Sequence, residues 1–132
     1  MKKKIFLFIA FGIGLLFLIQ NVQAAWTTKR LTWNSGWSAT PAIATDSSHN
    51  IYVAWYDNTP GNNEIYYKKS TDGGATWTSK RLTWNAGSSR SPSIAIDSNN
   101  NIYVVWHDST LGNCEIYYKK STDGGATWTS KR

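Results

Sequence analysis

The sequence predicts an all-β fold made of two repeats, each a four-stranded antiparallel sheet. Three observations lead to this prediction. The octet Ser-Thr-Asp-Gly-Gly-Ala-Thr-Trp occupies residues 70–77 and returns unchanged at 121–128, an offset of 51 residues. The segments around the octets repeat with the same period and are rich in β-branched and aromatic residues. From Ala25 onward no window has apolar residues at helical spacing.

Each repeat contains four segments with strand character, separated by polar or glycine-rich turns. We expect strands at 41–46, 51–55, 64–69 and 77–83, then at 91–97, 102–106, 115–120 and from 128 onward. Residues 26–32 match 77–83 and predict one more strand, which gives blades over 33–83 and 84–132. Residues 51–55 suit a strand that is buried on both faces. Such sheets must stack on a neighbour, as the blades of a β-propeller do.

The first 24 residues have the composition of a secretory signal peptide. Three lysines at 2–4 precede 15 apolar residues at 5–19, and Val22-Gln23-Ala24 offers a cleavage site. The apolar run is shorter than the roughly 20 residues of a membrane-spanning helix. We therefore expect cleavage after Ala24 and a secreted, extracellular or periplasmic protein without a stable membrane anchor. An uncleaved anchor is the alternative.

Charge and cysteine content limit the partners. The net charge is +6, and half of it comes from the three lysines of the leader. The other basic residues stand largely in repeated pairs at strand ends, so we expect no nucleic-acid partner. Cys114 is the single cysteine, which excludes an internal disulfide. It is interpreted as a free loop thiol, with an intermolecular bridge as the alternative.

The octet has the chemistry of a tight turn. Asp72 can accept bonds from nearby backbone N–H groups, Gly73 and Gly74 can adopt positive φ, and the hydroxyls of Ser70 and Thr76 add local bonds. Its pattern resembles the Asp-box (BNR) repeat of the sialidase-like β-propellers. The residues that carry this resemblance are Ser70, Asp72, Gly74, Thr76 and Trp77, and again Ser121, Asp123, Gly125, Thr127 and Trp128.

The resemblance covers residues 25–132 and implies that the chain is part of a sialidase-like β-propeller. In that family the box joins the third and fourth strands of a blade, faces away from the active site and has a structural role. The resemblance therefore implies that ligands are bound at the opposite face. The loops expected there span 33–40, 57–63, 84–91 and 108–114.

Many differences between the two repeats fall in these loops, where residues are freer to act specifically. The candidate ligand-binding residues are Trp37, Asp57, Arg90, His107 and Asp108. The segment Ser89-Arg90-Ser91-Pro92 resembles the Phe-Arg-Ile-Pro segment of sialidases, in which three arginines hold a carboxylate. The aromatic and the isoleucine are missing here, and Ala39 stands at the matching position of the first repeat. Arg30, Arg81 and Arg132 recur with the period and are interpreted as structural, so no catalytic residue is predicted.

Three tryptophans, Trp33, Trp37 and Trp84, are further candidates, because indole rings beside polar groups can bind sugars. Packing between blades is the alternative, favoured for Trp33 and Trp84 because they repeat. Residues 97–101 lack the glycine and the distant Glu of a calcium loop and predict a tight turn. His49 and His107 have no partner at metal-ligand spacing. We expect neither a metal nor a cofactor.

These observations predict a non-catalytic module that binds a glycan or an extracellular protein through its loop face. A fragment of an exo-sialidase-like glycoside hydrolase is the alternative. Two blades do not close a ring, because propellers need roughly four to eight. Self-association or further blades are therefore expected, and a partial chain is favoured over a two-blade protein that assembles as a trimer.

Overall fold

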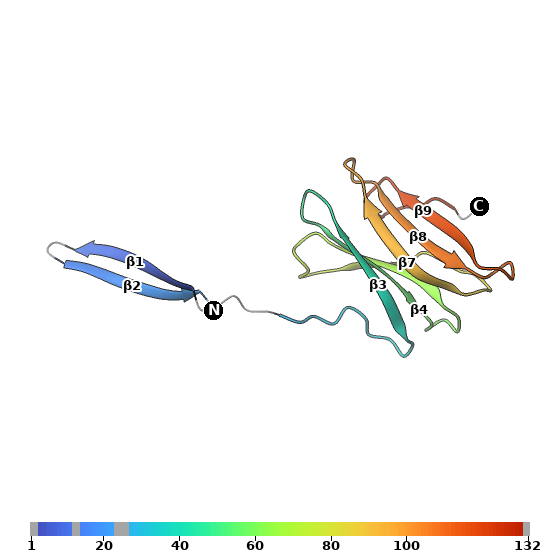
Figure 1. Cartoon of the computed structure of the whole chain (residues 1–132), viewed down its shortest axis with the longest axis horizontal. Helices are drawn as coiled ribbons and strands as arrows, with labels where there is room; N and C mark the ends of the chain where they lie inside the picture. Colours follow the sequence, from blue (N-terminus) through green and yellow to red (C-terminus); the bar gives the residue numbers. More distant parts are fainter. Residues whose placement is uncertain (1–2, 12–13, 23–26, 131–132) are drawn as a thin grey trace. The chain divides into compact units, whose positions relative to one another are not determined.

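A computed structural model describes residues 3–11, 14–22 and 27–130 of the chain (Figure 1). Every regular element in these ranges is a β-strand. The strands are β1 (Lys3–Phe11), β2 (Gly14–Val22), β3 (Ser38–Thr45), β4 (Ile51–Asp57), β5 (Glu64–Ser70), β6 (Thr78–Arg81), β7 (Ser89–Ile96), β8 (Ile102–Asp108) and β9 (Glu115–Ser121). No helix in the described ranges has the length and apolar character that a membrane span needs. The predicted all-β fold is confirmed.

Residues 1–31 form a unit of their own, in which β1 and β2 pair antiparallel with Lys3 opposite Val22. This hairpin does not test export, so the signal peptide over residues 1–24 stays a prediction. The strand expected at 26–32 is wrong for the residues described, because 27–32 belong to no strand. The matching segment, β6, forms by pairing with β5 of its own sheet.

Residues 32–132 form the second unit, which contains two antiparallel sheets. The first blade has the strand order β3-β4-β5-β6, and the second has the order β7-β8-β9. Equivalent strands share one register: Ile51 lies opposite Ser70 in the first blade, and Ile102 lies opposite Ser121 in the second. The 51-residue repeat is therefore a structural repeat as well.

Two strand boundaries differ from prediction. β3 and β7 begin at Ser38 and Ser89, in segments expected to be loop. Each contains a register shift, and Thr40 and Ser91 adopt φ of 45° and 50° there. A bulge of this kind lets a strand continue past an interruption that local sequence does not reveal.

The second blade has three strands among the described residues, not the predicted four. Thr129 N–H donates to the carbonyl of Lys120 over 2.9 Å, which is the first contact expected of a fourth strand. The equivalent pair in the first blade, Lys69 with Thr78, begins the pairing of β5 with β6. Residues 128–130 do not extend this contact into a strand, and 131–132 lie outside the described residues.

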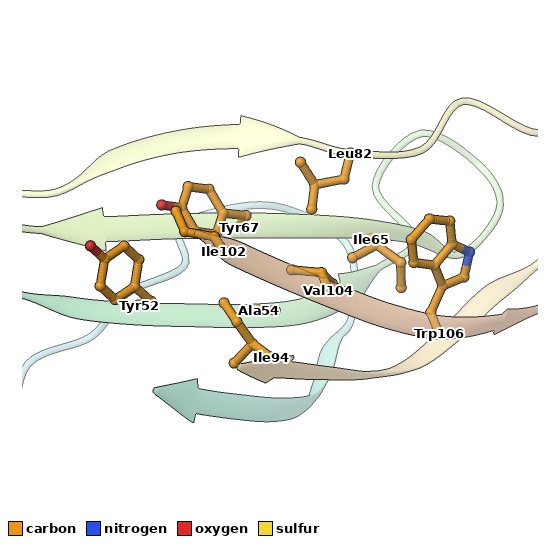
Figure 2. Close-up of a cluster of buried hydrophobic side chains, with 9 residues drawn as sticks. All are labelled: Tyr52, Ala54, Ile65, Tyr67, Leu82, Ile94, Ile102, Val104 and Trp106. Carbon is orange, nitrogen blue, oxygen red and sulfur yellow. The ribbon is translucent and has the colours of Figure 1, made fainter. Parts of the chain in front are cut away.

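The hydrophobic core lies between the two blades (Figure 2). The first blade contributes Tyr52, Ala54, Ile65, Tyr67 and Leu82, and the second contributes Ile94, Ile102, Val104 and Trp106. Burying each large apolar side chain contributes about 1.5–3 kcal/mol. The second-blade residues do not occupy the repeat positions of the first-blade residues. One face of the first blade is therefore covered by the opposite face of the second, and the blades stack head to tail.

The strand at the centre of the first blade is buried on both faces, as predicted. In β4, Tyr52 and Ala54 point into the core, while Val53 and Trp55 on the other face are also buried. Trp55 stacks on Tyr66 of β5 with ring centroids 5.8 Å apart. The first blade therefore has apolar packing on both of its sides.

Candidate functional site

The first octet is a turn closed by its own side chains. Asp72 accepts hydrogen bonds from the Thr76 backbone N–H at 2.9 Å and from the Ser70 hydroxyl at 2.7 Å. Gly74 N–H donates to Ser70 Oγ over 2.8 Å, and the Trp77 indole donates to the Gly74 carbonyl over 3.0 Å. Hydrogen bonds from Thr76 and Ser70 lower the pKa of Asp72 to about 2. The Asp72 carboxylate is thus used inside the turn.

The second octet repeats these bonds. Thr127 N–H donates to Asp123 at 2.9 Å, Gly125 N–H donates to Ser121 Oγ at 2.8 Å, and the Trp128 indole donates to the Gly125 carbonyl at 3.1 Å. Hydrogen bonds from Thr127 and Ser121 hold the pKa of Asp123 well below its usual range. Because both octets use their polar groups internally, their geometry favours a structural role.

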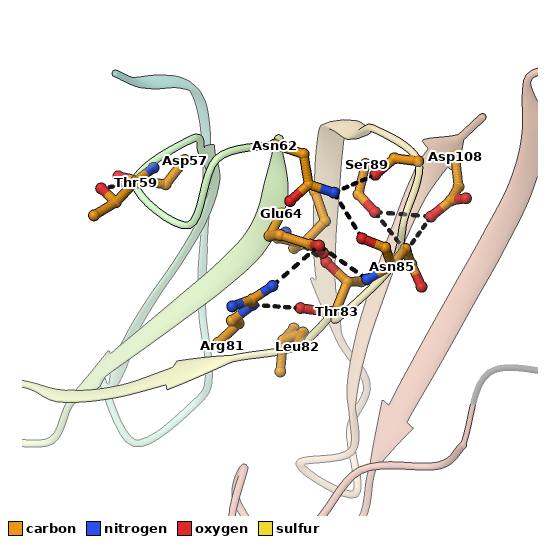
Figure 3. Close-up of polar contacts among 12 residues, drawn as sticks. Asp57, Thr59, Asn62, Glu64, Arg81, Leu82, Thr83, Asn85, Ser89 and Asp108 are labelled. Carbon is orange, nitrogen blue, oxygen red and sulfur yellow. Dashed lines mark hydrogen bonds and ion pairs between the residues drawn. The ribbon is translucent and has the colours of Figure 1, made fainter. Parts of the chain in front are cut away.

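Asp57 and Asp108 end β4 and β8 and are both 1% exposed. Asp108 accepts hydrogen bonds from Ser89 Oγ at 2.8 Å and from the Asn85 amide (Figure 3). It also accepts a hydrogen bond from the Thr110 N–H at 2.9 Å. These bonds tie the segment before β7 to the loop after β8. The sequence singled out Asp108 as a ligand-binding candidate, but its carboxylate is committed to the blade.

Asp57 has the same arrangement in the first blade. It accepts from Ser38 Oγ at 2.6 Å, from the Thr59 N–H at 2.8 Å and from the Asn34 amide. Burial raises the pKa of Asp57, but the hydrogen bonds from Ser38, Thr59 and Asn34 outweigh it and leave the pKa below its ordinary value. A buried, ionised and fully bonded carboxylate is poorly placed to bind a ligand.

The loop between β4 and β5 holds the start of the second blade. Asn62 Nδ2 donates to the carbonyls of Asn85 and Gly87, at 2.6 and 2.7 Å. Glu64, 0% exposed, accepts from the Asn85 N–H at 2.9 Å and pairs with Arg81 at 3.0 Å (Figure 3). Glycine is required at 87, because a Cβ there would lie 2.4 Å from the Thr110 nitrogen.

A depression of about 190 Å³ opens on the second blade beside these loops. Its lining is Ser88, Arg90, His107, Ser109 and Cys114. Arg90 and His107 lie opposite each other on β7 and β8. With the amide of Asn63 turned so that its oxygen faces the guanidinium, Oδ1 accepts from Nε and Nη2 of Arg90 and from Ser88 Oγ, each at 2.8 Å. Arg90 is exposed but held in place.

All five lining residues stand at positions where the two repeats differ. Their first-repeat counterparts are Trp37, Ala39, Tyr56, Asn58 and Asn63. The residues that support the depression from below, such as Asp108 and Ser89, are the same in both repeats. The second blade therefore carries a surface of different chemistry on a shared frame.

The depression brings together two of the five predicted ligand-binding residues, Arg90 and His107. Asp108 lies beneath the surface, and Trp37 and Asp57 belong to the first blade, where Trp37 is 69% exposed. Trp37 N–H donates to Asn58 Oδ1 over 2.6 Å, so its backbone is fixed. Ser88, Ser109 and Cys114 were not predicted from the sequence as ligand-binding residues. The differences between the repeats at these positions were the signal that could have found them.

Trp33 and Trp84 have equivalent environments at the two blades. Their side chains are 66% and 65% exposed, so burial between the blades, favoured from the sequence, is wrong. The ammonium of Lys68 lies 5.6 Å from the Trp33 ring, and that of Lys119 lies 5.7 Å from the Trp84 ring. Arg81 lies 5.5 Å from Trp84 as well. These repeated cation–π contacts hold both indoles at the blade surface.

Other polar groupings are committed elsewhere. A larger hollow of about 430 Å³ lies beside the second octet, where Lys69 donates to the Gly124 carbonyl over 3.4 Å and Lys80 donates to that of Ala126. Asp97 accepts from the N–H groups of Asn99 and Asn101 at 2.9 and 2.8 Å, which is the predicted tight turn. In the part of the chain that the structure describes, no three His, Cys, Asp or Glu residues are grouped as metal ligands.

No protein-family model matches the chain, and no curated protein matches it in sequence. Solved structures do resemble it. A Hadza microbial sialidase superposes with a TM-score of 0.63 at 15% identity, over 89% of this chain and 31% of that one. A protein of unknown function from Dyadobacter fermentans gives 0.57 at 18%, over 75% and 36%.

A putative glycoside hydrolase from Parabacteroides distasonis gives a TM-score of 0.56 at 17% identity, over 75% of this chain and 33% of that one. This chain therefore spans about a third of the length of the solved structures that it resembles. At these identities the likeness is one of fold. The chain has the fold of sialidase-like β-propellers, of which it contains two antiparallel blades.

Proposed function

We propose that the chain is a secreted, non-catalytic β-propeller module that binds a glycan through its loop face, with its octets as Asp-box turns. The observation that carries this proposal is the depression on the second blade. All five of its lining residues differ from their first-repeat counterparts, whereas the frame beneath it is shared. A surface that varies on a constant scaffold is typical of a recognition site.

The lining suits a small polar ligand group. Arg90 presents a guanidinium that can bind a carboxylate or sulfate, and His107 and the two serine hydroxyls can bond to sugar oxygens. A volume of about 190 Å³ is small compared with the 300–1,000 Å³ of ordinary ligand pockets. We therefore infer that one acidic sugar unit of a longer glycan enters the depression. An acidic protein side chain is the competing occupant.

A piece of a sialidase-like glycoside hydrolase remains the second candidate, because the solved structures with this fold include a sialidase and a putative glycoside hydrolase. Glycoside hydrolysis commonly needs two free carboxyl groups or an equivalent pair. Asp57 and Asp108 are buried and bonded inside their blades. One arginine, Arg90, lines the depression. These features favour binding over turnover for this chain.

A glycan array followed by calorimetry on the purified chain tests the proposal. Arg90→Ala places the first-repeat residue in the second repeat, and we expect it to weaken binding of an acidic glycan about tenfold or more. Arg90→Lys keeps the charge but loses the planar fork, and we expect an intermediate effect. Lys80→Ala removes a positive charge beside the second octet and serves as the matched control.

Three results would contradict the proposal. If Arg90→Ala left the affinity for the glycan unchanged, the glycan would bind outside the depression. Hydrolysis of a fluorogenic sialoside, lost in Arg90→Ala, would make the chain part of an enzyme. If no glycan bound and an acidic peptide did, the ligand would be a protein and not a glycan.

A further inference from the structure

The second blade leaves open a face that the first blade has covered. The three apolar residues at its centre are Val105, Ile116 and Tyr118, which are 40%, 76% and 61% exposed. Their first-repeat counterparts are Ala54, Ile65 and Tyr67, which are 0%, 0% and 2% exposed. The same repeat positions thus form the core in one blade and an exposed apolar patch in the other.

Inside the chain, one surface of the second blade covers the first-blade face. The repeat counterpart of that surface lies on the first blade itself. In the core, the first-blade face is covered by the opposite face of the second blade, which includes Ile94 at 9% exposure. The counterpart of Ile94 in the first blade is Ile43, which is 69% exposed, whereas Val53 and Trp55, the counterparts of Val104 and Trp106, are 8% and 6% exposed. The matching face of the first blade is therefore exposed at Ile43 and covered at Val53 and Trp55. Two chains can join the open face of the second blade to the exposed part of this first-blade face.

The polar contacts of the junction can be repeated in the same way. Asn62 donates to the carbonyls of Asn85 and Gly87 at the junction inside the chain. The second repeat has Asn113 at the position of Asn62, and the first repeat has Asn34 and Gly36 at the positions of Asn85 and Gly87. Asn113 of one chain can therefore make the same two bonds to another copy.

A third set of residues differs between the junction inside the chain and the junction that two copies would form. All three of its members change together. Inside the chain, the side chain of Asn63 contacts Ser88 and Arg90 at 2.8 Å. The equivalents of these three residues are Cys114, Trp37 and Ala39. A polar set of three is thus replaced by an apolar set of three. Cys114 and Trp37 are both exposed in the single chain.

We propose that the open face of the second blade binds the first blade of another copy of this chain, head to tail, with Cys114 of one copy against Trp37 of the next. The matched replacement favours a copy of this chain as the occupant, because its first blade supplies Trp37 and Ala39. The interface is heterologous, so repeated association produces a ring or a linear assembly.

A designed disulfide tests this arrangement. Asn63→Cys with Ser88→Cys in a Cys114→Ser background calibrates the geometry, because those side chains touch inside the chain. Copper–phenanthroline, the oxidant, should close this bond within one chain. Trp37→Cys retains Cys114 and should give covalently linked dimers and longer species under the same conditions. The unmodified chain should not, because its Cys114 residues are far from one another in a head-to-tail assembly.

Sedimentation equilibrium provides a second measurement that needs no new cysteine. The unmodified chain should associate at micromolar concentration, and Ile116→Lys, which places a charge on the open face, should shift it to monomer. A monomeric unmodified chain would overturn the proposal, including the case in which a further blade of a longer protein covers this face. The proposal would also be overturned if Trp37→Cys formed no disulfide between chains while the variant with Asn63→Cys and Ser88→Cys did form its disulfide. Disulfide-linked dimers of the unmodified chain, joined through Cys114 of each copy, would overturn it as well.

Discussion

Tyr67 of the first blade and Trp128 of the second meet edge to face, with ring centroids 5.1 Å apart and an interplanar angle of 72°. Trp128 belongs to the second octet, and its indole also closes that turn by donating to the Gly125 carbonyl. Aromatic pairs of this geometry contribute about 0.5–1.5 kcal/mol beyond their area burial. The second octet therefore stabilises its own turn and the junction between the blades.

The two equivalent glycines of the octets separate these roles. Gly74 and Gly125 have φ of 92° and 95°, so alanine at either site should cost about 1–2 kcal/mol of unfolding free energy from backbone strain. At Gly125 the added Cβ would also lie 2.6 Å from Tyr67 Oη, whereas at Gly74 the nearest atom is 3.7 Å away. We expect Gly125→Ala to cost about 1–3 kcal/mol more than Gly74→Ala.

Urea unfolding of both variants, followed by circular dichroism, measures this difference. Gly74→Ala is the matched control, because it carries the same strain without the contact to the neighbouring blade. Equal losses of stability would mean that Tyr67 moves aside freely, and that the octet does not support the junction.

The carboxylates of the octets predict a loss of stability in acid. The pKa of Asp72 in the folded chain is about 2, against 3.8 for the free side chain. A carboxyl group with a lowered folded-state pKa stabilises the fold above its unfolded-state value, and this contribution is lost as the pH falls through the folded-state value. We expect the unfolding free energy to decrease from about pH 4 to about pH 2.

Urea midpoints measured between pH 2 and pH 7 test this expectation. The double variant Asp72→Asn, Asp123→Asn should have a lower midpoint at pH 7 and a flatter decline in acid. Asp46, Asp57 and Asp97 also have lowered pKa values, so some of the decline should persist. An unchanged slope in the double variant would show that the octet carboxylates do not contribute.

Identical isoleucines at equivalent positions should have unequal effects. Ile65 is 0% exposed in the core and Ile116 is 76% exposed on the open face. Ile65→Ala should cost about 2–5 kcal/mol because it leaves a cavity. Ile116→Ala should stay within about 0.5 kcal/mol in dilute solution. Thermal and urea unfolding at low protein concentration measure both, and similar losses would mean that the open face is covered within the single chain.

Much of the fold could be predicted from the sequence, because the repeat fixes the period and strand character fixes the elements. The positions of β4, β5, β8 and β9 follow from their β-branched and aromatic residues. The starts of β3 and β7 do not, since Thr40 and Ser91 adopt positive φ without a glycine to signal it. Residues 27–32 look like β6 in sequence but lie in no strand, because strand formation depends on pairing as well as on local sequence.

The candidate site was predicted in part. Arg90 and His107 stood out because the repeats differ there, and they do lie side by side. Asp57 and Asp108 stood out as acidic residues at loop starts, but the serine and asparagine that bond to each of them lie about 20 residues away in the sequence. Burial at such a position depends on how two loops meet, which residue type alone does not determine.

Asp108 and Arg90 are therefore expected to respond differently to substitution. Asp108→Asn replaces a buried acceptor with an amide that turns a donor toward Asn85 or Ser89, and should cost about 2–3 kcal/mol. Asp57→Asn should cost a similar amount, because its bonds are equivalent. Arg90→Ala removes an exposed side chain and should change the unfolding free energy by less than about 1 kcal/mol. Urea unfolding of the three variants, together with their affinity for an acidic glycan, distinguishes residues that support the blade from residues that bind the ligand. If Asp108→Asn instead kept full stability and lost affinity, Asp108 would be a ligand-binding residue, and its role as a support for the loops would be wrong.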